Sequence, residues 1–413
     1  MAQEKNSVEN SGFDSHAFLD LIERATDRPE SFSQQVVESV KNNPEACIPL
    51  LIKVFENSDE ANKRFVADLF KTHLKFLANT VLLSAMKMDQ PEKFFWIASI
   101  LSELGEKKVI PVLIEGLKST IKNTVIASLK GLSQFREPEA LQAQIDFFLS
   151  NSDWVHLTVA MRHLALRASE VIPKLMSFFP EMKEERKAWI LKFLAETGDP
   201  GSLTLFKEVL ERETTKLGMF CIHGLGKIGS PEAIAILAKN LSNPEWFVRK
   251  KIIDALGVTK SKEAIPPLIK GLTDISLQVR AGAIEGLTKV GHYDIETLVG
   301  ELGSGAHDLR VGLIRVLGKT HDARAVKPLV GTLSDRTTLF FSLDALGDLG
   351  FVEAAPALES FINDPDWFNR LNALEALSKL HPPNIRNIAE KCLEDPNDMV
   401  RISATRIFSQ TGE

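Results

Sequence analysis

The sequence predicts an all-α protein, a solenoid of about 11 to 12 stacked helical hairpins of roughly 30 residues each. The first observation behind this prediction is a pair of short amphipathic segments within Pro244–Leu272. One segment carries an apolar stripe at helical spacing, and the other begins near Pro266 after a break at 257–261. Helices of about three turns cannot bury such stripes alone. The pair must therefore stack on similar units.

The second observation is that the pair recurs with a steady period. The apolar residue at the position of Leu256, which we use as a register mark, returns every 28 to 32 residues at Leu74, Leu104, Leu132, Leu164, Leu194, Leu225, Leu256, Leu287, Leu317, Leu346, Leu377 and Phe408. The third observation is a recurring sequence motif, as in ALGVTKSKEAIPPL, VLGKTHDARAVKPL and ALGDLGFVEAAPAL. Such a period over most of a chain identifies a repeat array.

The domain organisation follows from the part of the chain in which this repeat motif is clear. Residues 1–12 are polar and are predicted to form a disordered tail. In residues 13–60 the repeat motif is faint, and they are expected to form an N-terminal cap of three helices, around Phe13–Ala25, Phe32–Lys41 and Pro44–Phe55. Residues 61–413 form the array, which ends with a helix at Met399–Ser409 and continues from the cap as one domain.

Composition narrows the class of protein. A formal net charge of −6 argues against nucleic-acid binding driven by bulk charge. The three cysteines have no CxxC spacing, which excludes a zinc ribbon and favours buried thiols in a reducing compartment. The N-terminus lacks an apolar signal segment, and no apolar run approaches the roughly 20 residues of a membrane span. We therefore expect a cytoplasmic protein without membrane insertion.

A ladder of basic residues lies seven positions before the register mark, at Lys187, Arg249, Arg280, Arg310, Arg370 and Arg401. Acidic residues such as Asp274 precede several of these positions, where a carboxylate can cap the first turn of a helix. The basic residue can then reach the Asp of an adjoining repeat and stabilise the stack. The alternative is a row of cations for an anionic ligand. The ladder lapses in 335–341 (DRTTLFF), which adds two Phe.

These residues carry a resemblance to a known family. The pattern D-P-x-x-x-V-R, A-L-G and A-x-P-x-L at about 30 residues resembles the short PBS-lyase HEAT-like repeats over roughly 61–409, most clearly in 231–401. The resemblance implies a right-handed α-solenoid with first helices on the convex side and second helices on the concave side. Members of that family include bilin lyases and their chaperone-like subunits, and many more are binding scaffolds.

Motifs for chemistry are weak in this sequence. A literal GxGxxG at 224–229 follows a first helix rather than a strand, so it is expected to end that helix rather than bind a dinucleotide. Two His-Asp pairs, at His307 and His321, occupy different places in the repeat and are not expected to meet at a metal. The sequence therefore predicts no catalytic, cofactor-binding or metal-ligating residues.

Aromatic residues at the starts of first helices are the most informative irregularities. Trp246-Phe247 and Trp367-Phe368 are near copies, and Trp154 is a weaker third example. On helical spacing both Phe residues lead into polar stripes and are expected to be partly exposed, whereas Trp367 leads into a core face. The rings either pack against a neighbouring turn or anchor a partner.

We expect a non-enzymatic scaffold that binds a partner protein or peptide on the concave surface of the solenoid, with second helices making most contacts. One alternative is a bilin lyase or chromophore-handling protein, which co-expression with a phycobiliprotein and bilin would test by a coloured adduct. The second alternative, a nucleic-acid-binding HEAT-like protein, requires a basic concave face.

Overall fold

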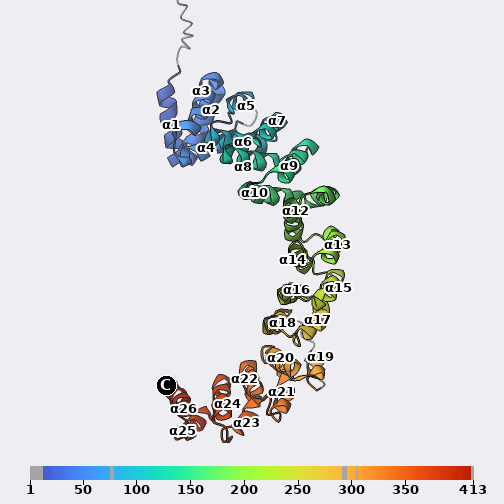
Figure 1. Ribbon diagram of the computed structural model, residues 1–413. Helices are drawn as coiled ribbons and strands as arrows, with labels where there is room; N and C mark the ends of the chain where they lie inside the picture. The colour runs from blue at the N-terminus through green and yellow to red at the C-terminus, as the bar shows by residue number, and fades with distance from the viewer. Residues whose placement is uncertain (1–12, 75–78, 291–294, 304, 411–413) are drawn as a thin grey trace, which may run out of the picture. The chain divides into compact units, whose positions relative to one another are not determined.

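The computed structural model describes residues 13–74, 79–290, 295–303 and 305–410 (Figure 1). The tail expected at 1–12 lies outside the described residues. Within them the chain is built of α-helices and short 3-10 helices, with no strand. Contacts between helices divide the chain into two units, 1–175 and 176–413. The all-α prediction is confirmed.

The first unit begins with a bundle and continues as stacked hairpins. Its helices are α1 (Ser15–Asp27), α2 (Pro29–Asn42), α3 (Pro44–Asn57), α4 (Glu60–Thr72), α5 (Asn79–Ala85), α6 (Pro91–Glu103), α7 (Ile110–Gly116), α8 (Lys122–Leu132), α9 (Pro138–Ser150), α10 (Trp154–Leu164) and α11 (Ala168–Phe178), the last crossing into the second unit. Helices α1 to α4 pack on one another, and α6, α8 and α10 then stack in succession. Fully buried Phe side chains, including Phe55, Phe70 and Phe94, fill the core.

The second unit alternates a first and a second helix in each repeat. The first helices are α12 (Glu184–Thr197), α14 (Gly218–Ile228), α16 (Trp246–Val258), α18 (Leu277–Val290), α20 (His307–Gly318), α22 (Leu339–Leu349), α24 (Trp367–Leu380) and α26 (Asp398–Gln410). The second helices are α13 (Leu203–Arg212), α15 (Pro231–Lys239), α17 (Ile265–Gly271), α19 (Ile295–Leu302), α21 (Val326–Thr332), α23 (Ala355–Glu359) and α25 (Ile385–Cys392). Several second helices follow a 3-10 turn, such as η8 (Val352–Ala354) before α23.

Successive first helices of the second unit pack directly on one another, whereas neighbouring second helices approach each other much less closely. Small residues near the ends of the first helices permit this. A Cβ atom added to Gly257 would lie 2.7 Å from the Cα of Gly286 in the next repeat, and one added to Gly318 would lie 2.7 Å from the Cα of Ala345. The glycine of the A-L-G motif therefore lies in the first helix where the next first helix packs closely against it.

The spacing of the two helix rows corrects the expected orientation of the hairpins. A stack bends toward the side on which its elements lie closer together, and here that side carries the first helices. In Figure 1 the even-numbered first helices from α16 to α24 follow the inner edge of the second unit. The odd-numbered second helices from α17 to α23 follow its outer edge. The expectation that second helices line the concave side is wrong for this unit. We call the solvent-facing side of these first helices the inner surface.

Candidate binding surface on the first helices

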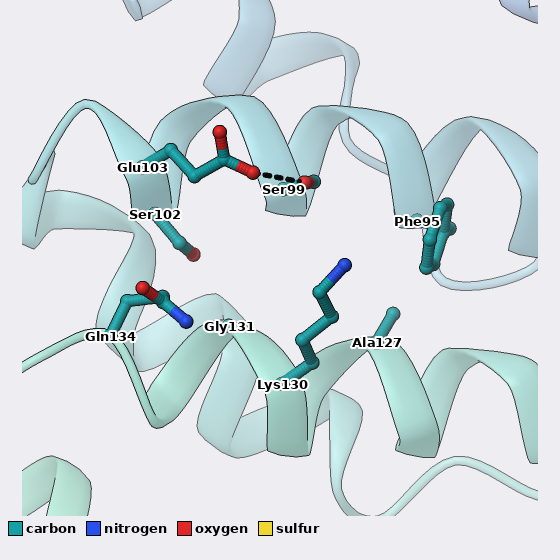
Figure 2. A pocket seen from close by; sticks show the side chains of 8 residues that line it. All are labelled: Phe95, Ser99, Ser102, Glu103, Ala127, Lys130, Gly131 and Gln134. Atoms are coloured by element: carbon teal, nitrogen blue, oxygen red, sulfur yellow. Dashed lines mark hydrogen bonds between the residues drawn. The ribbon is translucent and has the colours of Figure 1, made fainter. Parts of the chain in front are cut away.

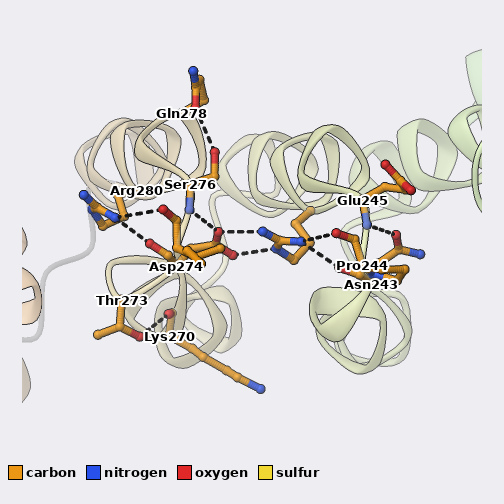
Figure 3. A network of polar contacts seen from close by, with 11 residues as sticks. Asn243, Pro244, Glu245, Lys270, Thr273, Asp274, Ser276, Gln278 and Arg280 are labelled. Carbon is orange, nitrogen blue, oxygen red and sulfur yellow. Dashed lines mark hydrogen bonds and ion pairs between the residues drawn. The ribbon is translucent and has the colours of Figure 1, made fainter.

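Arg249 of the basic ladder joins two successive repeats through Asp274, which Figure 3 labels together with Asn243 and Pro244. Its Nε and Nη2 atoms donate to both carboxylate oxygens of Asp274, at 2.6 and 2.8 Å. Its Nη1 atom donates to the carbonyl oxygens of Asn243 and Pro244, at 2.8 and 2.9 Å. Asp274 also accepts from the backbone N–H of Ser276, at 2.8 Å. Four hydrogen bonds from this guanidinium, which has five N–H groups, thus point into the stack.

The same arrangement returns near the end of the array. Arg370 donates to both carboxylate oxygens of Asp395, at 2.7 and 2.8 Å. Arg310 pairs with Asp335 at 2.9 Å, and Arg401 donates to the carbonyl oxygen of Asp395 at 2.6 Å. Together with Arg249, four ladder positions therefore contact an Asp in the loop that precedes a first helix.

The two remaining ladder residues make looser contacts. Arg280 donates to the carbonyl oxygen of Asp274 at 2.7 Å, and its guanidinium lies 3.9 Å from a carboxylate oxygen of Asp308. The Lys187 ammonium lies 5.4 Å from the centroid of the Phe179 ring. These contacts direct the ladder toward protein groups, which favours a stacking role over an anion site.

Hydrogen bonding across the ladder also shifts its acid–base equilibria. The guanidinium of Arg249 lowers the pKa of Asp274, and that of Arg370 lowers the pKa of Asp395. The same bonds raise the pKa of both Arg side chains. The ion pairs are therefore retained to lower pH than isolated carboxylates would allow.

The five aromatic residues singled out at helix starts are all exposed, from 38% for Phe247 to 69% for Trp154. Trp154 lies at the start of α10 in the first unit, and Trp246 begins α16. The expectation that Trp367 faces the core is wrong, because its side chain is 41% exposed. Trp367 is the first residue of α24, so its side chain projects beyond the helix end, where no preceding turn can cover it.

Two of these residues join an aromatic cluster that spans α22 and α24. The Phe368 ring lies 5.2 Å from Phe340, and Phe340 lies 5.1 Å from Phe341. The Trp367 ring lies 5.7 Å from Phe368. The irregular 335–341 segment thus contributes half of the cluster. Trp246 and Phe247 form a separate pair on α16, 6.3 Å apart.

A groove on the inner surface crosses α18, α20 and α22 beside this cluster. It consists of two hollows of about 350 and 320 Å³ that share Ala281, Ile284, Arg315 and Phe341. We define the inner groove by the residues that line these hollows, among them Leu277, Arg280, Ala281, Ile284, Asp308, Val311, Arg315, Lys319, Phe341, Asp344 and Asp348. Because Phe341 lies in both the groove and the cluster, the two features form one continuous surface.

The carboxylates of the inner groove have basic partners in the protein. Asp344 and Asp348 both accept from the Lys379 ammonium, at 2.9 and 2.7 Å. Asp308 lies near the guanidinium of Arg280. These negative charges are thus largely compensated within the repeat stack.

Two cations of the inner groove, Arg315 in α20 and Lys319 at the C-cap of that helix, lack such compensation. The Arg315 guanidinium lies over the Phe341 ring, 5.3 Å from its centroid. Within 13–74, 79–290, 295–303 and 305–410, neither Arg315 nor Lys319 forms an ion pair. Both side chains are exposed. The uncompensated charge at the centre of the groove is therefore positive.

A small pocket between α6 and α8 in the first unit is not a comparable site (Figure 2). Its volume is about 20 Å³, enough for a water molecule. The Lys130 ammonium lies 5.2 Å from the centroid of the Phe95 ring. Glu103 accepts from the Ser99 hydroxyl at 2.9 Å and pairs with Lys71 at 2.8 Å. The charged groups Glu103 and Lys130 therefore have partners, whereas the buried Ser102 hydroxyl has no hydrogen-bond partner among the described residues.

The nucleotide-like motif at 224–229 is part of the helix stack. A Cβ atom added to Gly224 would lie 2.5 Å from the Phe206 ring, and one added to Gly226 would lie 2.9 Å from the Cβ of Ala255. Gly229, with φ of +60°, ends α14 in the left-handed conformation. These glycines serve close packing and helix termination.

The remaining candidate chemistries find no assembled site in the described part of the chain. There, His, Cys, Asp and Glu form no group of three or more that is placed to hold a metal ion. Cys47, Cys221 and Cys392 are buried free thiols, and burial raises the pKa of Cys47 to about 11. No described helix combines the length and apolar character required to cross a bilayer.

Comparison with known proteins identifies the repeat. A family model of HEAT repeats matches residues 168–257, 214–288 and 335–409, so the chain contains HEAT repeats. No curated protein matches the sequence.

Among solved structures, the fold is similar to that of the karyopherin Kap121p bound to the extreme C-terminus of the protein phosphatase Cdc14p, with a TM-score of 0.51 and 12% identity. Kap121p bound to Ste12p gives the same two values. Each match covers 95% of this chain and 52% of the other, so the chain spans about half the length of these karyopherins. At this identity the likeness concerns the fold alone.

Sequence reasoning missed Arg315 and Lys319, although a signal was present. Two residues before the register mark, the neighbouring repeats place Asp254, Glu285 and Asp344, all acidic, whereas this repeat places Arg315. Arg315 is the one basic residue of this column between Asp254 and Glu375, although the column is basic again outside that stretch, as at Lys192 and Arg406. The groove itself depends on the distances between neighbouring helices, which the sequence pattern does not reveal.

Proposed function

We propose that the chain is a non-enzymatic scaffold that holds a segment of a partner protein in the inner groove. The observation that carries this proposal is the continuity of the groove with the aromatic cluster, in which Phe340 and Phe341 are half-buried and Trp367 and Phe368 are exposed. Large aromatic side chains supply much of the binding energy at protein interfaces when they meet a complementary surface. A contiguous surface of this kind marks an interaction site.

The dimensions of the groove suit a peptide. Its two hollows, of about 350 and 320 Å³, follow one another across three first helices. Volumes of this size accommodate several side chains of an extended segment. The repeat architecture supports the same function, because stacked repeats present long binding surfaces. The karyopherin structures with this fold were solved with Cdc14p or Ste12p bound.

We also propose that the repeats are of the short PBS-lyase HEAT-like kind, since their period is about 30 residues. Trp246 and Phe247, at the start of α16, would extend the binding surface beyond the groove. Trp154, in the first unit, would form a separate contact point. In this proposal the ladder of Arg249 and its equivalents maintains the stack.

Selection from a displayed library of random 16-residue peptides, with the full chain as bait, tests the proposal. We expect selected peptides to bind the Phe368→Ser and Phe341→Ser variants at least about tenfold more weakly, the loss of one aromatic anchor. Phe368 is exposed, so its variant should keep the melting temperature of the parent chain. Val352→Ser, an exposed apolar site on the second-helix side, is the matched control and should bind normally.

Two results would contradict the proposal. One is a failure to select any binding peptide. The other is a set of peptides whose affinity is unchanged in both Phe variants.

A further inference from the structure

We infer that the segment held in the inner groove is an extended acidic stretch in which two carboxylates, separated by one residue and flanked by apolar side chains, bind Arg315 and Lys319. This inference rests on the proposed function and names the chemistry of the partner.

Arg315 is prepared to receive a carboxylate. Its guanidinium stacks over the Phe341 ring at 5.3 Å, which restricts the side chain and leaves the N–H groups at the guanidinium edge available. An edge of this kind matches the two oxygens of a carboxylate. The side chain is exposed toward both hollows of the groove. A ligand can therefore bind without breaking an existing ion pair.

Lys319 extends the site by one helical turn. It lies four residues after Arg315, at the C-cap of α20, so the two residues emerge on one side of the helix end, about 6 Å apart. In an extended chain, residues i and i+2 point the same way and lie about 6.6 Å apart. The two cations therefore match the pattern of two acidic residues separated by one other residue.

The acidic residues in and near the groove already have basic partners, so the groove should prefer an acidic ligand to a basic one. Asp344 and Asp348 are bound to Lys379, and Asp308 lies near Arg280, so these carboxylates offer little to a basic ligand. Glu285, the acidic residue of α18, is bound to Lys289 at 2.7 Å, and this bond, with a weaker long-range contribution from Lys319, lowers the pKa of Glu285. Two cations without such partners remain, and an acidic segment complements them.

The apolar part of the groove defines the residues beside the carboxylates. Phe341 lines both hollows, and Leu277, Ile284 and Val311 contribute further apolar wall. These side chains would cover Leu, Ile or Phe residues of the partner. A nucleic-acid strand fits less well, because the apolar wall leaves a continuous phosphate backbone without polar partners and the whole chain carries −6.

The test compares peptides selected by the parent chain with those selected by an Arg315→Glu/Lys319→Glu variant from the same random library. For the parent, we expect enrichment of two Asp or Glu residues separated by one residue and flanked by apolar ones. These peptides should lose at least about tenfold in affinity for the variant, whose own selection should enrich Lys and Arg instead. Lys270→Glu/Lys262→Glu, on the second-helix side, controls for net charge and should select the same peptides as the parent.

The outcomes separate this inference from the proposed function. Peptides that depend on Phe341 but lack acidic residues, or that bind the Arg315→Glu/Lys319→Glu variant normally, overturn the inference and leave the proposed function standing. Failure to select any peptide overturns both. Binding of a fluorescein-labelled 20-nucleotide oligothymidine more tightly than of the selected peptides, with loss in the same variant, overturns the inference in favour of a nucleic-acid ligand.

Discussion

At the scale of single residues, the ion pair between Arg370 and Asp395 is the clearest source of stability between repeats. Both side chains are about nine-tenths buried, and the pair is bidentate. We expect Arg370→Leu to lower the free energy of unfolding by about 3 kcal/mol, because it leaves a buried carboxylate without its partner. Urea denaturation followed by circular dichroism measures this loss.

The matched control for that substitution is Lys289→Leu, which removes an ion pair with Glu285 in which both side chains are more than half exposed. Its effect on the free energy of unfolding should be close to zero, because solvent screens an exposed pair. The double substitution Arg370→Leu/Asp395→Leu should recover much of the loss, since no buried charge remains. Equal losses of unfolding free energy in Arg370→Leu and Lys289→Leu would show that the buried pair stabilises the fold no more than the exposed pair does.

The same pairs predict a dependence of stability on pH. Arg249 and Arg370 lower the folded-state pKa of Asp274 and Asp395, so the stabilisation is complete above the ordinary Asp pKa of about 4 and is lost as pH falls toward the lowered values. We expect the free energy of unfolding to drop below about pH 5, and to drop less steeply in Asp274→Asn/Asp395→Asn. Parallel pH profiles for the parent and this variant would contradict the assignment.

At the scale of helices, the close approach of first helices depends on glycine. A Cβ atom at position 257 would lie 2.7 Å from the backbone of Gly286, so α16 and α18 must separate to accept it. We expect Gly257→Ala to destabilise the chain by about 1–2 kcal/mol, the cost of overpacking less the gain in helix propensity. Gly331→Ala, in α21 with open space around the added atom, should be neutral or stabilising. A thermal melt of both variants measures the difference, and equal behaviour would contradict the packing account.

Helical periodicity and the register mark made the helices themselves predictable. The three helices expected at the N-terminus correspond to α1, α2 and α3, with ends displaced by two or three residues at most of their boundaries. The direction of curvature was not predictable from periodicity, because it depends on how closely each row of helices packs. Gly257 was expected to end its helix, yet α16 continues through it to Val258.

At the scale of the whole molecule, contacts run mainly between neighbouring helices, so destabilisation should remain local. Phe94 is fully buried, and we expect Phe94→Ala to cost about 3–5 kcal/mol. Hydrogen exchange should then accelerate in α6 and α8 while α22 and α24 keep the rates of the parent chain. Uniform acceleration along the chain would instead indicate a single cooperative unit.

The candidate surface was only partly predictable, for physical reasons that differ between residues. Phe368 was identified because it interrupts a polar stripe within one helix. Phe340 completes the cluster from the preceding repeat, and Arg315 lies over Phe341 through a contact between α20 and α22. Contacts between repeats depend on the lateral spacing of helices, which no single segment encodes.

The central claim is that the inner surface formed by first helices holds the partner segment. Photo-crosslinking tests it most directly, with a selected peptide that carries a benzophenone side chain and mass spectrometry to locate the attachment sites on the full chain. We predict attachment to α18, α20 and α22, around Ile284, Val311 and Phe341. Attachment to second helices such as α17, α19 and α21 would contradict the claim.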